Sequence, residues 1–499
     1  MRLRLAYCLM MLVAALPSAA RTLSAQIPAG EYADRRDQLL AHIDSGVVVA
    51  FGGAGEVTHW PPTRQLPSFM YLTGFDEPDA VLLLVKRGGA RAATLFVPPR
   101  NPRMELFVGA RVGPTEVQER TGMTGRPVAD FRRALDSLLD AGLPMYVVSD
   151  VHSIDYAAVD TLTRSARFVE HLRSGRPALG VVSLDSVVER MRARKSPAEL
   201  ALLRRAAQIS VAAHREAMRA AAPGCNEGEI QALMEGVFRR MGAERPSYGS
   251  IVGSGPNALV LHYDRNARQM EAGDLLLIDA AAEFDHYGAD VTRTMPVSGR
   301  FTPAQRAVYD IVLAAQAAYV RQIRPGGTVR MANDSGRAVV GAGLARLGLI
   351  DSANATYDAP SPNRCPPAGC PQIGLYAWHG FGGHGIGLEV HDPAQYYDAP
   401  GNFAPGDVFT VEPGIYVNPA ILDGLPDTPR NRALVARLRP VMDRYRNVGV
   451  RIEDDYAVTA TGVEWLSAGV PREAAEIEAL RRRPSPQLPG GGTCAKPRM

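Results

Sequence analysis

Two aspartates in the second half of the chain lie at the edges of strand-like segments. The apolar run from Leu275 to Ile278 leads directly into Asp279, and Asp290 follows eleven positions later within Gly-Ala-Asp-Val-Thr-Arg. A continuous apolar run of this length predicts a buried strand that delivers its last residue to the edge of a sheet. The pattern therefore places two carboxylates on adjacent strands. A plain hairpin, with Asp290 in solvent and Asp279 capping a turn, also fits this pair alone.

Two glutamates end strand-like runs further along the chain. Glu412 follows the run 408–411 and precedes Pro413-Gly414, and Glu453 ends a segment in which Val448, Val450 and Ile452 alternate with other residues. Because side chains of a strand alternate between its two faces, Arg451 and Glu453 share the face opposite the apolar one. A solvent-exposed pair of Arg451 and Glu453 is the alternative interpretation of this strand.

Three of the ten histidines lie within a glycine-rich segment of thirteen residues, 379–391. They are His379, His384 and His391, and the glycines between them allow the backbone to approach a small site closely. Metal binding and simple turn formation would both explain this composition.

Taken together, four carboxylates and an imidazole on separate strands and loops form an oxygen-rich ligand set. Such a set suits two divalent cations. Four converging carboxylates without cations would be very costly to bury, so their convergence implies bound metal. The absence of thiolates from the set argues against a structural zinc site.

The elements that must position these residues indicate an α/β (α+β) protein of two domains. Strand-like runs alternate with helical stretches in residues 26–185, which predicts an N-terminal α/β domain. Residues 186–470 follow as the catalytic domain. Within it, helix-start signals at Ser196-Pro197 and again at Thr302-Pro303 suggest an internal duplication, with a cleft between two similar halves.

Both ends of the chain are expected to lie outside the folded body. Residues 1–25 carry Arg2 and Arg4 before an apolar run of 12 residues, which is typical of a secretory signal peptide and too short for a membrane span. A periplasmic or secreted location follows from it. Residues 471–499, rich in proline and glycine toward the end, are expected to form a disordered tail.

An oxidising compartment also bears on the cysteines. Cys365 and Cys370 flank a Pro-Pro-Ala-Gly turn, and we expect a disulfide bond between them.

The charge of the chain gives no reason to expect nucleic acid as a partner. The formal net charge is +3, and removing the eight basic residues of the signal segment and the tail leaves about −5 on the folded body. No segment after the signal is long and apolar enough to span a membrane.

The five ligand candidates resemble, in order and in local context, the metal ligands of the M24 pita-bread metallopeptidases. The matching motifs are His-x-x-Gly-Leu-x-Val-His-Asp from His384, Glu-Pro-Gly at Glu412 and Arg-Ile-Glu-Asp at Arg451. The segment from Phe69 to Val81 is similar to the N-terminal domain of aminopeptidase P. The resemblance spans roughly residues 30–470 and implies a pita-bread catalytic domain behind a creatinase-like domain.

The resemblance also implies roles for the metal ligands. Asp290 and Glu453 would bridge two ions, Asp279 would hold one of them, and His384 and Glu412 the other. Manganese is the expected metal, with cobalt or zinc as alternatives. A metal-activated water would attack the carbonyl that precedes proline, with Glu412 as the general base.

Four further residues are expected to contact substrate. His262 and His391 resemble the histidines that bind substrate and stabilise the tetrahedral intermediate, and His379 and Arg451 are expected to bind substrate as well. The implied activity is an aminopeptidase that releases the residue before a proline from a peptide. A prolidase acting on Xaa-Pro dipeptides, an inactive binding protein and a creatinase-like amidinohydrolase are the alternatives. Relatives commonly form dimers or tetramers.

The histidine spacing departs from the family pattern and yields a prediction. Relatives place two histidines four residues apart at this point, whereas His379 and His384 are five apart. Because His384 and His391 are seven residues apart, as in the family, we expect His384 to be the ligand. His384→Ala should abolish tight metal binding, while His379→Ala should leave both ions bound and at most slow turnover.

Metal analysis of the two purified variants checks this assignment. Loss of metal from His379→Ala with retention in His384→Ala would show that the register of the whole loop is wrong.

Overall fold

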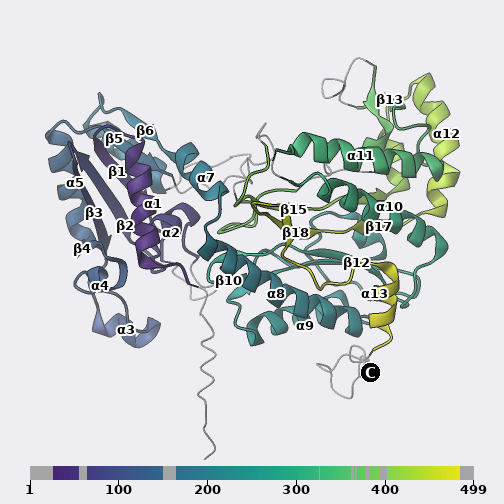
Figure 1. Ribbon diagram of the computed structural model, residues 1–499, viewed down its shortest axis with the longest axis horizontal. Coiled ribbons are helices and arrows are strands. Elements are labelled where there is room, and N and C mark those ends of the chain that lie inside the picture. The colour runs from purple at the N-terminus through teal and green to yellow at the C-terminus, as the bar shows by residue number, and fades with distance from the viewer. Residues whose placement is uncertain are drawn as a thin grey trace, which may run out of the picture.

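The computed structural model describes residues 26–55, 64–149, 164–324, 326–360, 365, 368–376, 383–392 and 402–483. In Figure 1 the chain forms two bodies, an N-terminal one in purple and blue and a larger C-terminal one in teal, green and yellow, with α7 (Asp185–Ala193) between them. The predicted α/β architecture is confirmed. The expected signal segment, residues 1–25, lies outside the described residues.

The N-terminal half is built on a mixed six-stranded sheet of order β4-β3-β2-β1-β5-β6. Its central strand β1 pairs antiparallel with β2 and parallel with β5, and β2 continues antiparallel into β3. The strands are β1 (Gly46–Phe51), β2 (Val81–Arg87), β3 (Ala90–Val97), β4 (Thr124–Pro127), β5 (Met145–Val148) and β6 (Val181–Ser183).

Helices cover both faces of this sheet, which explains why β1 is buried along its whole length. Val47 and Val49 pack in one cluster with Phe131 of α5, whereas Val48 and Ala50 join a second cluster on the opposite face. The helices of this half are α1 (Ala29–Ala41), α2 (Pro67–Thr73), α3 (Pro102–Val108), α4 (Val117–Thr121), η1 (Val128–Asp130), α5 (Phe131–Asp140) and α6 (Arg164–Gly175).

The duplicated helix pairs expected in the C-terminal half are present. Ser196 and Thr302 each form a capping box, and each is followed by proline at the first helical turn. Both caps satisfy backbone N–H groups that a helix start leaves unpaired. The first pair comprises α8 (Pro197–Ala220) and α9 (Glu227–Arg240), and the second α10 (Pro303–Val320) and α11 (Val329–Arg346).

Short sheets lie beside these helices in the C-terminal half. Their strand orders are β12-β9-β8, β15-β18-β19, β16-β17, β11-β10-β7 and β13-β14. The strands are β7 (Arg245–Pro246), β8 (Ile251–Ser254), β9 (Leu275–Asp279), β10 (Ala282–Phe284), β11 (Tyr287–Gly288), β12 (Thr292–Pro296), β13 (Thr356–Tyr357), β14 (Cys370–Pro371), β15 (Val408–Val411), β16 (Gly414–Val417), β17 (Val448–Arg451), β18 (Asp454–Val458) and β19 (Val463–Trp465). The remaining elements are η2 (Gly255–Leu259), η4 (Gln372–Leu375), η6 (Pro419–Gly424) and α12 (Pro429–Arg444).

Cys365 and Cys370 are disulfide-bonded, as predicted, with their Cα atoms 5.0 Å apart. Cys370 opens β14, so the bond closes a short loop at the β13-β14 hairpin.

His214 on α8 has a structural role. Its ring is fully buried, and Nε2 lies 2.9 Å from the carbonyl oxygen of Ala280. Burial lowers the pKa of this imidazole to about 4, so it is neutral at physiological pH. The contact between His214 and Ala280 links α8 to the turn after β9.

The last helix corrects the predicted start of the disordered tail. Helix α13 (Ala474–Arg481) falls inside the segment 471–499, and Ile477 and Leu480 are buried in the core of the C-terminal half. The guanidinium of Arg481 also donates to the carbonyl oxygens of Met218 and Val297. The short apolar face of α13 was not predicted, because the composition beyond Arg481 is basic and rich in proline. The folded domain therefore extends at least to Arg481, and residues 484–499 lie outside the described residues.

Among the described residues, no helix combines the length and apolarity needed to cross a lipid bilayer.

Candidate metal centre

The first two carboxylates are brought together by the pairing of β9 with β12. Asp279, the last residue of β9, lies opposite Thr292, the first residue of β12, and Asp290 comes two positions before Thr292. Both aspartates are buried. This is the arrangement on adjacent strands that the sequence predicted, and the alternative with Asp290 in solvent is wrong.

The two glutamates are brought together in the same way by β15 and β18. Val411 on β15 pairs with Asp454 on β18 in antiparallel register, so Glu412 and Glu453 come next to this pair at the same end and lie across from each other. The hydroxyl of Thr292 donates to Glu453 Oε2 at 2.6 Å, which joins the two strand pairs. Four carboxylates from four strand ends thus converge.

His384 is positioned by a loop that runs alongside β15. Thr410 N donates to the His384 carbonyl oxygen at 2.9 Å, and His384 N donates to the Thr410 hydroxyl at 3.2 Å. The loop lies so close to the strand that a Cβ on Gly383 would meet the Thr410 hydroxyl at 1.7 Å. Glycine is therefore required next to the histidine.

The ring of His384 faces the carboxylates from this position. Nε2 is 3.4 Å from Asp290 Oδ2 and 3.5 Å from Glu412 Oε1. One ligand atom each from Asp290, His384 and Glu453 lies within 4.8 Å of the others, which is a geometry that can hold a metal ion. His379 lies outside the described residues, so the choice of His384 over His379 stays a prediction.

Two residues that were not predicted, Tyr248 and Thr410, form hydrogen bonds with the carboxylates of the centre. The Tyr248 hydroxyl lies 2.5 Å from Asp279 Oδ1 and 2.6 Å from Asp290 Oδ1. The Thr410 hydroxyl donates to Glu412 Oε1 at 3.1 Å. No pattern in the sequence marks Tyr248. Each carboxylate oxygen keeps a further lone pair, so these bonds leave room for a cation.

Arg451 is the nearest permanent cation to the cluster. Its guanidinium contacts Asp279 Oδ2 and donates to the Tyr416 hydroxyl at 2.8 Å and the Thr292 hydroxyl at 3.0 Å. The alternative of an exposed Arg451–Glu453 pair is wrong, because both residues are buried. The expected contact of Arg451 with substrate stays a prediction. Tyr416, on β16 four residues after Glu412, was not among the predicted site residues.

A second arginine fixes the backbone behind the carboxylates. Arg293 is fully buried, and it pairs with Asp454 at 2.6 Å while donating to the Glu453 carbonyl oxygen at 2.6 Å and to that of Thr292 at 2.9 Å. It also reaches the carbonyl oxygen of Val470. β12 and β18 are thereby tied together directly behind Asp290 and Glu453.

The electrostatics of the cluster favour bound cations. Burial raises the pKa of Asp290, Glu412 and Glu453, and the neighbouring carboxylates raise it further, while Arg451 opposes the shift at both glutamates. The pKa of Glu412 rises to about 7. A single arginine does not balance four carboxylates. The donor set of carboxylate oxygens and one imidazole therefore fits divalent metal ions.

The other predicted site residues lie around this centre. The ring of His391 lies against that of His384, with centroids 3.7 Å apart and ring planes inclined at 44°. His262 is exposed on the loop after η2. Its sequence neighbours Leu261 and Tyr263 pack against the apolar cluster that contains Tyr416. The structure therefore brings His391 directly to the centre. The catalytic roles of His262 and His391 stay predictions.

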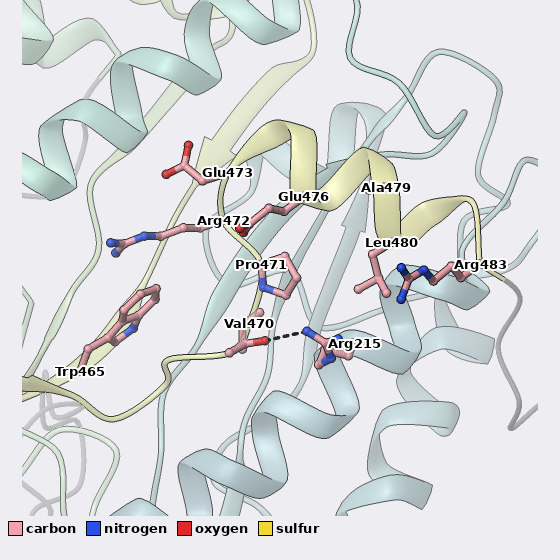
Figure 2. A pocket seen from close by; sticks show the side chains of 11 residues that line it. Arg215, Trp465, Val470, Pro471, Arg472, Glu473, Glu476, Ala479, Leu480 and Arg483 are labelled. Carbon is pink, nitrogen blue, oxygen red and sulfur yellow. Dashed lines mark hydrogen bonds between the residues drawn. The ribbon is translucent and has the colours of Figure 1, made fainter.

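A cavity of about 560 Å³ at the C-terminal end of the described chain is separate from this chemistry (Figure 2). Its walls include Trp465, Arg472 and Leu480, and Arg215 donates to the Gly469 carbonyl oxygen there. It contains none of the predicted site residues.

Comparison with known families matches both halves of the chain. The profile of metallopeptidase family M24 matches residues 201–460, and that of the aminopeptidase P N-terminal domain matches residues 32–145. The Xaa-Pro aminopeptidase of Escherichia coli (strain K12) is 35% identical over 468 residues, which cover 91% of this chain and 98% of the relative.

Solved structures agree with the sequence comparison. The structure of Escherichia coli aminopeptidase P with the inhibitor Pro-Leu has a TM-score of 0.75 at 34% identity, covering 91% of this chain and 98% of that one. A zinc-substituted form of the same enzyme in complex with product has a TM-score of 0.74 over the same shares at 34% identity.

The raised carboxyl pKa values predict that metal binding releases protons. In the ion-free protein Glu412 holds its proton between its ordinary value of 4.5 and about 7, and cations bind only its ionised form. Addition of Mn²⁺ at about pH 6 should therefore release protons, and Glu412→Gln should reduce the number released. Calorimetric titration in two buffers of different ionisation enthalpy measures this number.

The same shift fixes the sign of the stability change. A raised folded-state pKa means that the ion-free protein loses stability as pH rises from about 4.5 toward 7, whereas the metal-loaded protein should not. Metal binding without proton release at pH 6 would contradict the carboxyl assignment.

Proposed function

The chain belongs to metallopeptidase family M24, and from this premise we infer that it is an Xaa-Pro aminopeptidase, a metal-dependent hydrolase that releases the N-terminal residue of peptides with proline in second position. The observation that carries this function is the convergence of Asp279, Asp290, Glu412, Glu453 and His384 at one buried centre. The near full-length match to an Xaa-Pro aminopeptidase supplies the substrate class.

The residues of the centre either hold metal or react, and Glu412 does both. Asp279, Asp290, His384, Glu412 and Glu453 would hold two divalent ions. When bound, the ions polarise the scissile carbonyl and lower the pKa of a water molecule. Manganese is the proposed native metal because the donors are mostly carboxylate oxygens, and the zinc-substituted relative has the same fold.

Proton transfer and charge stabilisation fall to side chains of this chain. Glu412 lies beside His384, with its side chain 14% exposed, and it accepts the proton of the attacking water. His391, whose ring lies against that of His384, stabilises the oxygen that becomes negative as water adds, and His262 contacts the substrate.

The N-terminal domain favours the aminopeptidase over the prolidase alternative. It matches the profile of the aminopeptidase P N-terminal domain, and an Escherichia coli structure of that enzyme contains the inhibitor Pro-Leu. A proline-containing peptide is therefore the proposed ligand of the cleft.

A tripeptide assay tests the function. The Mn²⁺-loaded protein should hydrolyse Xaa-Pro-Xaa but not Xaa-Ala-Xaa, and exhaustive chelation should abolish the activity. Asp290→Asn should lower kcat/KM at least about 1,000-fold, because the centre loses a ligand carboxylate. Asp310, which is exposed on α10, provides the matched control, and Asp310→Asn should leave kcat/KM unchanged.

Three outcomes would count against this function. Activity that survives chelation would sink the metal mechanism, and equal cleavage of the alanine peptide would sink the proline specificity. Faster cleavage of an Xaa-Pro dipeptide than of the tripeptide would favour the prolidase.

We also propose a periplasmic or secreted location. The signal-like residues 1–25 and the Cys365–Cys370 disulfide bond support it, because such bonds persist in oxidising compartments. N-terminal sequencing of protein from the exported fraction should find a chain that lacks this segment. Full-length protein confined to the cytosolic fraction would contradict the proposal.

A further inference from the structure

The loop that carries His384 and His391 is held by charged residues outside the metal centre. Residues 383–392 form this loop, and Arg192 of α7 and Arg64 of the N-terminal half contact it. The proposed mechanism requires both histidines to keep a fixed position, but it assigns no role to the charges behind them.

Arg192 on α7 joins three separate parts of the chain. Its guanidinium donates to the Ser68 hydroxyl of α2 at 3.1 Å, and it lies 2.6 Å from Glu389 Oε2 and 2.8 Å from Asp392 Oδ1. The side chain is 5% exposed, so these contacts are shielded from water. Glu389 and Asp392 stand on either side of His391 in the sequence. Arg192 therefore contacts the loop on both sides of His391.

Asp392 closes the loop on itself at the same point. Its Oδ2 accepts a hydrogen bond from Leu388 N at 2.8 Å, and its backbone N donates to the Gly385 carbonyl oxygen at 2.7 Å. Lys195 Nζ donates to the Asp392 carbonyl oxygen at 3.1 Å and lies 4.0 Å from its carboxylate. The conformation between His384 and His391 thus depends on a side chain that Arg192 and Lys195 hold.

A second arginine, Arg64, belongs to the N-terminal half and contacts the same loop. Arg64 donates to the Leu388 carbonyl oxygen at 3.0 Å and pairs with the buried Glu283 at 2.9 Å. Ile386 and Leu388 pack in the apolar cluster that also contains Leu39 and Val48 of the N-terminal half. The loop is therefore an interface between the two halves of the chain.

Stability alone is a poor explanation for this charge cluster. Two buried cations facing the buried Asp392 and the partly buried Glu389 gain little over apolar side chains of similar volume, because desolvation offsets their attraction. The planar Arg192 guanidinium instead defines direction as well as distance, because one of its nitrogens contacts both carboxylates while another donates to Ser68. A catalytic group displaced by about 1 Å can lose about 100-fold in rate, so positional control has a large effect here.

We propose that Arg192 is a positioning residue for His391, and that its hydrogen bond to Ser68 makes the geometry of the catalytic loop depend on the N-terminal half. The inference rests on the proposed function for its kinetic consequence. It assigns the N-terminal domain a part in turnover.

The test compares Arg192→Met with Arg194→Met in the full, metal-loaded protein. Arg194 is two residues away, its side chain is 60% exposed, and it is the matched control. Arg192→Met should lower kcat for the tripeptide about 10- to 100-fold with KM within about threefold and the bound metal retained. Hydrogen exchange of the peptide spanning residues 383–392 should be at least about tenfold faster. Arg194→Met should change neither quantity.

A double-variant cycle separates positioning from general stability. Because Arg192 acts through Glu389, Arg192→Met/Glu389→Gln should lose no more kcat than Arg192→Met alone. Multiplicative losses would overturn the proposal, and so would a lower Tm with unchanged kcat and unchanged exchange in the loop. If Arg192→Met fails to fold, Glu389→Gln alone must show the slower turnover and the faster exchange.

The exchange measurement keeps this inference distinct from the proposed function. Should the wild-type protein not cleave Xaa-Pro peptides, the assigned function fails, yet loop exchange in the variants still decides whether Arg192 holds the loop.

Discussion

Gathering four carboxylates in one buried place is the constraint on which the rest of the C-terminal half depends. Burial raises the pKa of Asp290, Glu412 and Glu453, so the ionised cluster opposes folding until cations balance it. The surrounding structure must therefore hold like charges together. Tyr248, Thr292 and Thr410 donate hydrogen bonds to the carboxylates, and Arg451 supplies one local positive charge.

The duplicated architecture explains how the carboxylates arrive from both sides. Asp279 and Asp290 belong to the strands that follow the first helix pair, whereas Glu412 and Glu453 belong to those that follow the second. Each repeat thus contributes one antiparallel pair with acidic residues at its end. The hydrogen bond from Thr292 to Glu453 joins the two contributions. Neither repeat alone contains a complete ligand set.

Sequence patterns predicted the ligands better than the residues that support them. Asp279 and Glu412 could be found because each ends an apolar run, and the helix starts at Ser196 and Thr302 follow from local capping chemistry. Tyr248 could not be found, since its role arises only when its loop folds over β9 and β12. The exposed-pair alternative for Arg451 failed because alternation along a strand cannot reveal that both faces are covered.

Arg293, the buried arginine behind the carboxylates, affects how metal ions bind to the centre. Arg293 fixes the backbones of β12 and β18 through Thr292, Glu453 and Asp454, so these two strands are joined without a bound ion. Cation binding then requires no ordering of β12 or β18, and the conformational entropy of assembling this cradle of strands is lost during folding. A preformed cradle also discriminates by ionic radius, because rigid strands adjust little to an ion of the wrong size.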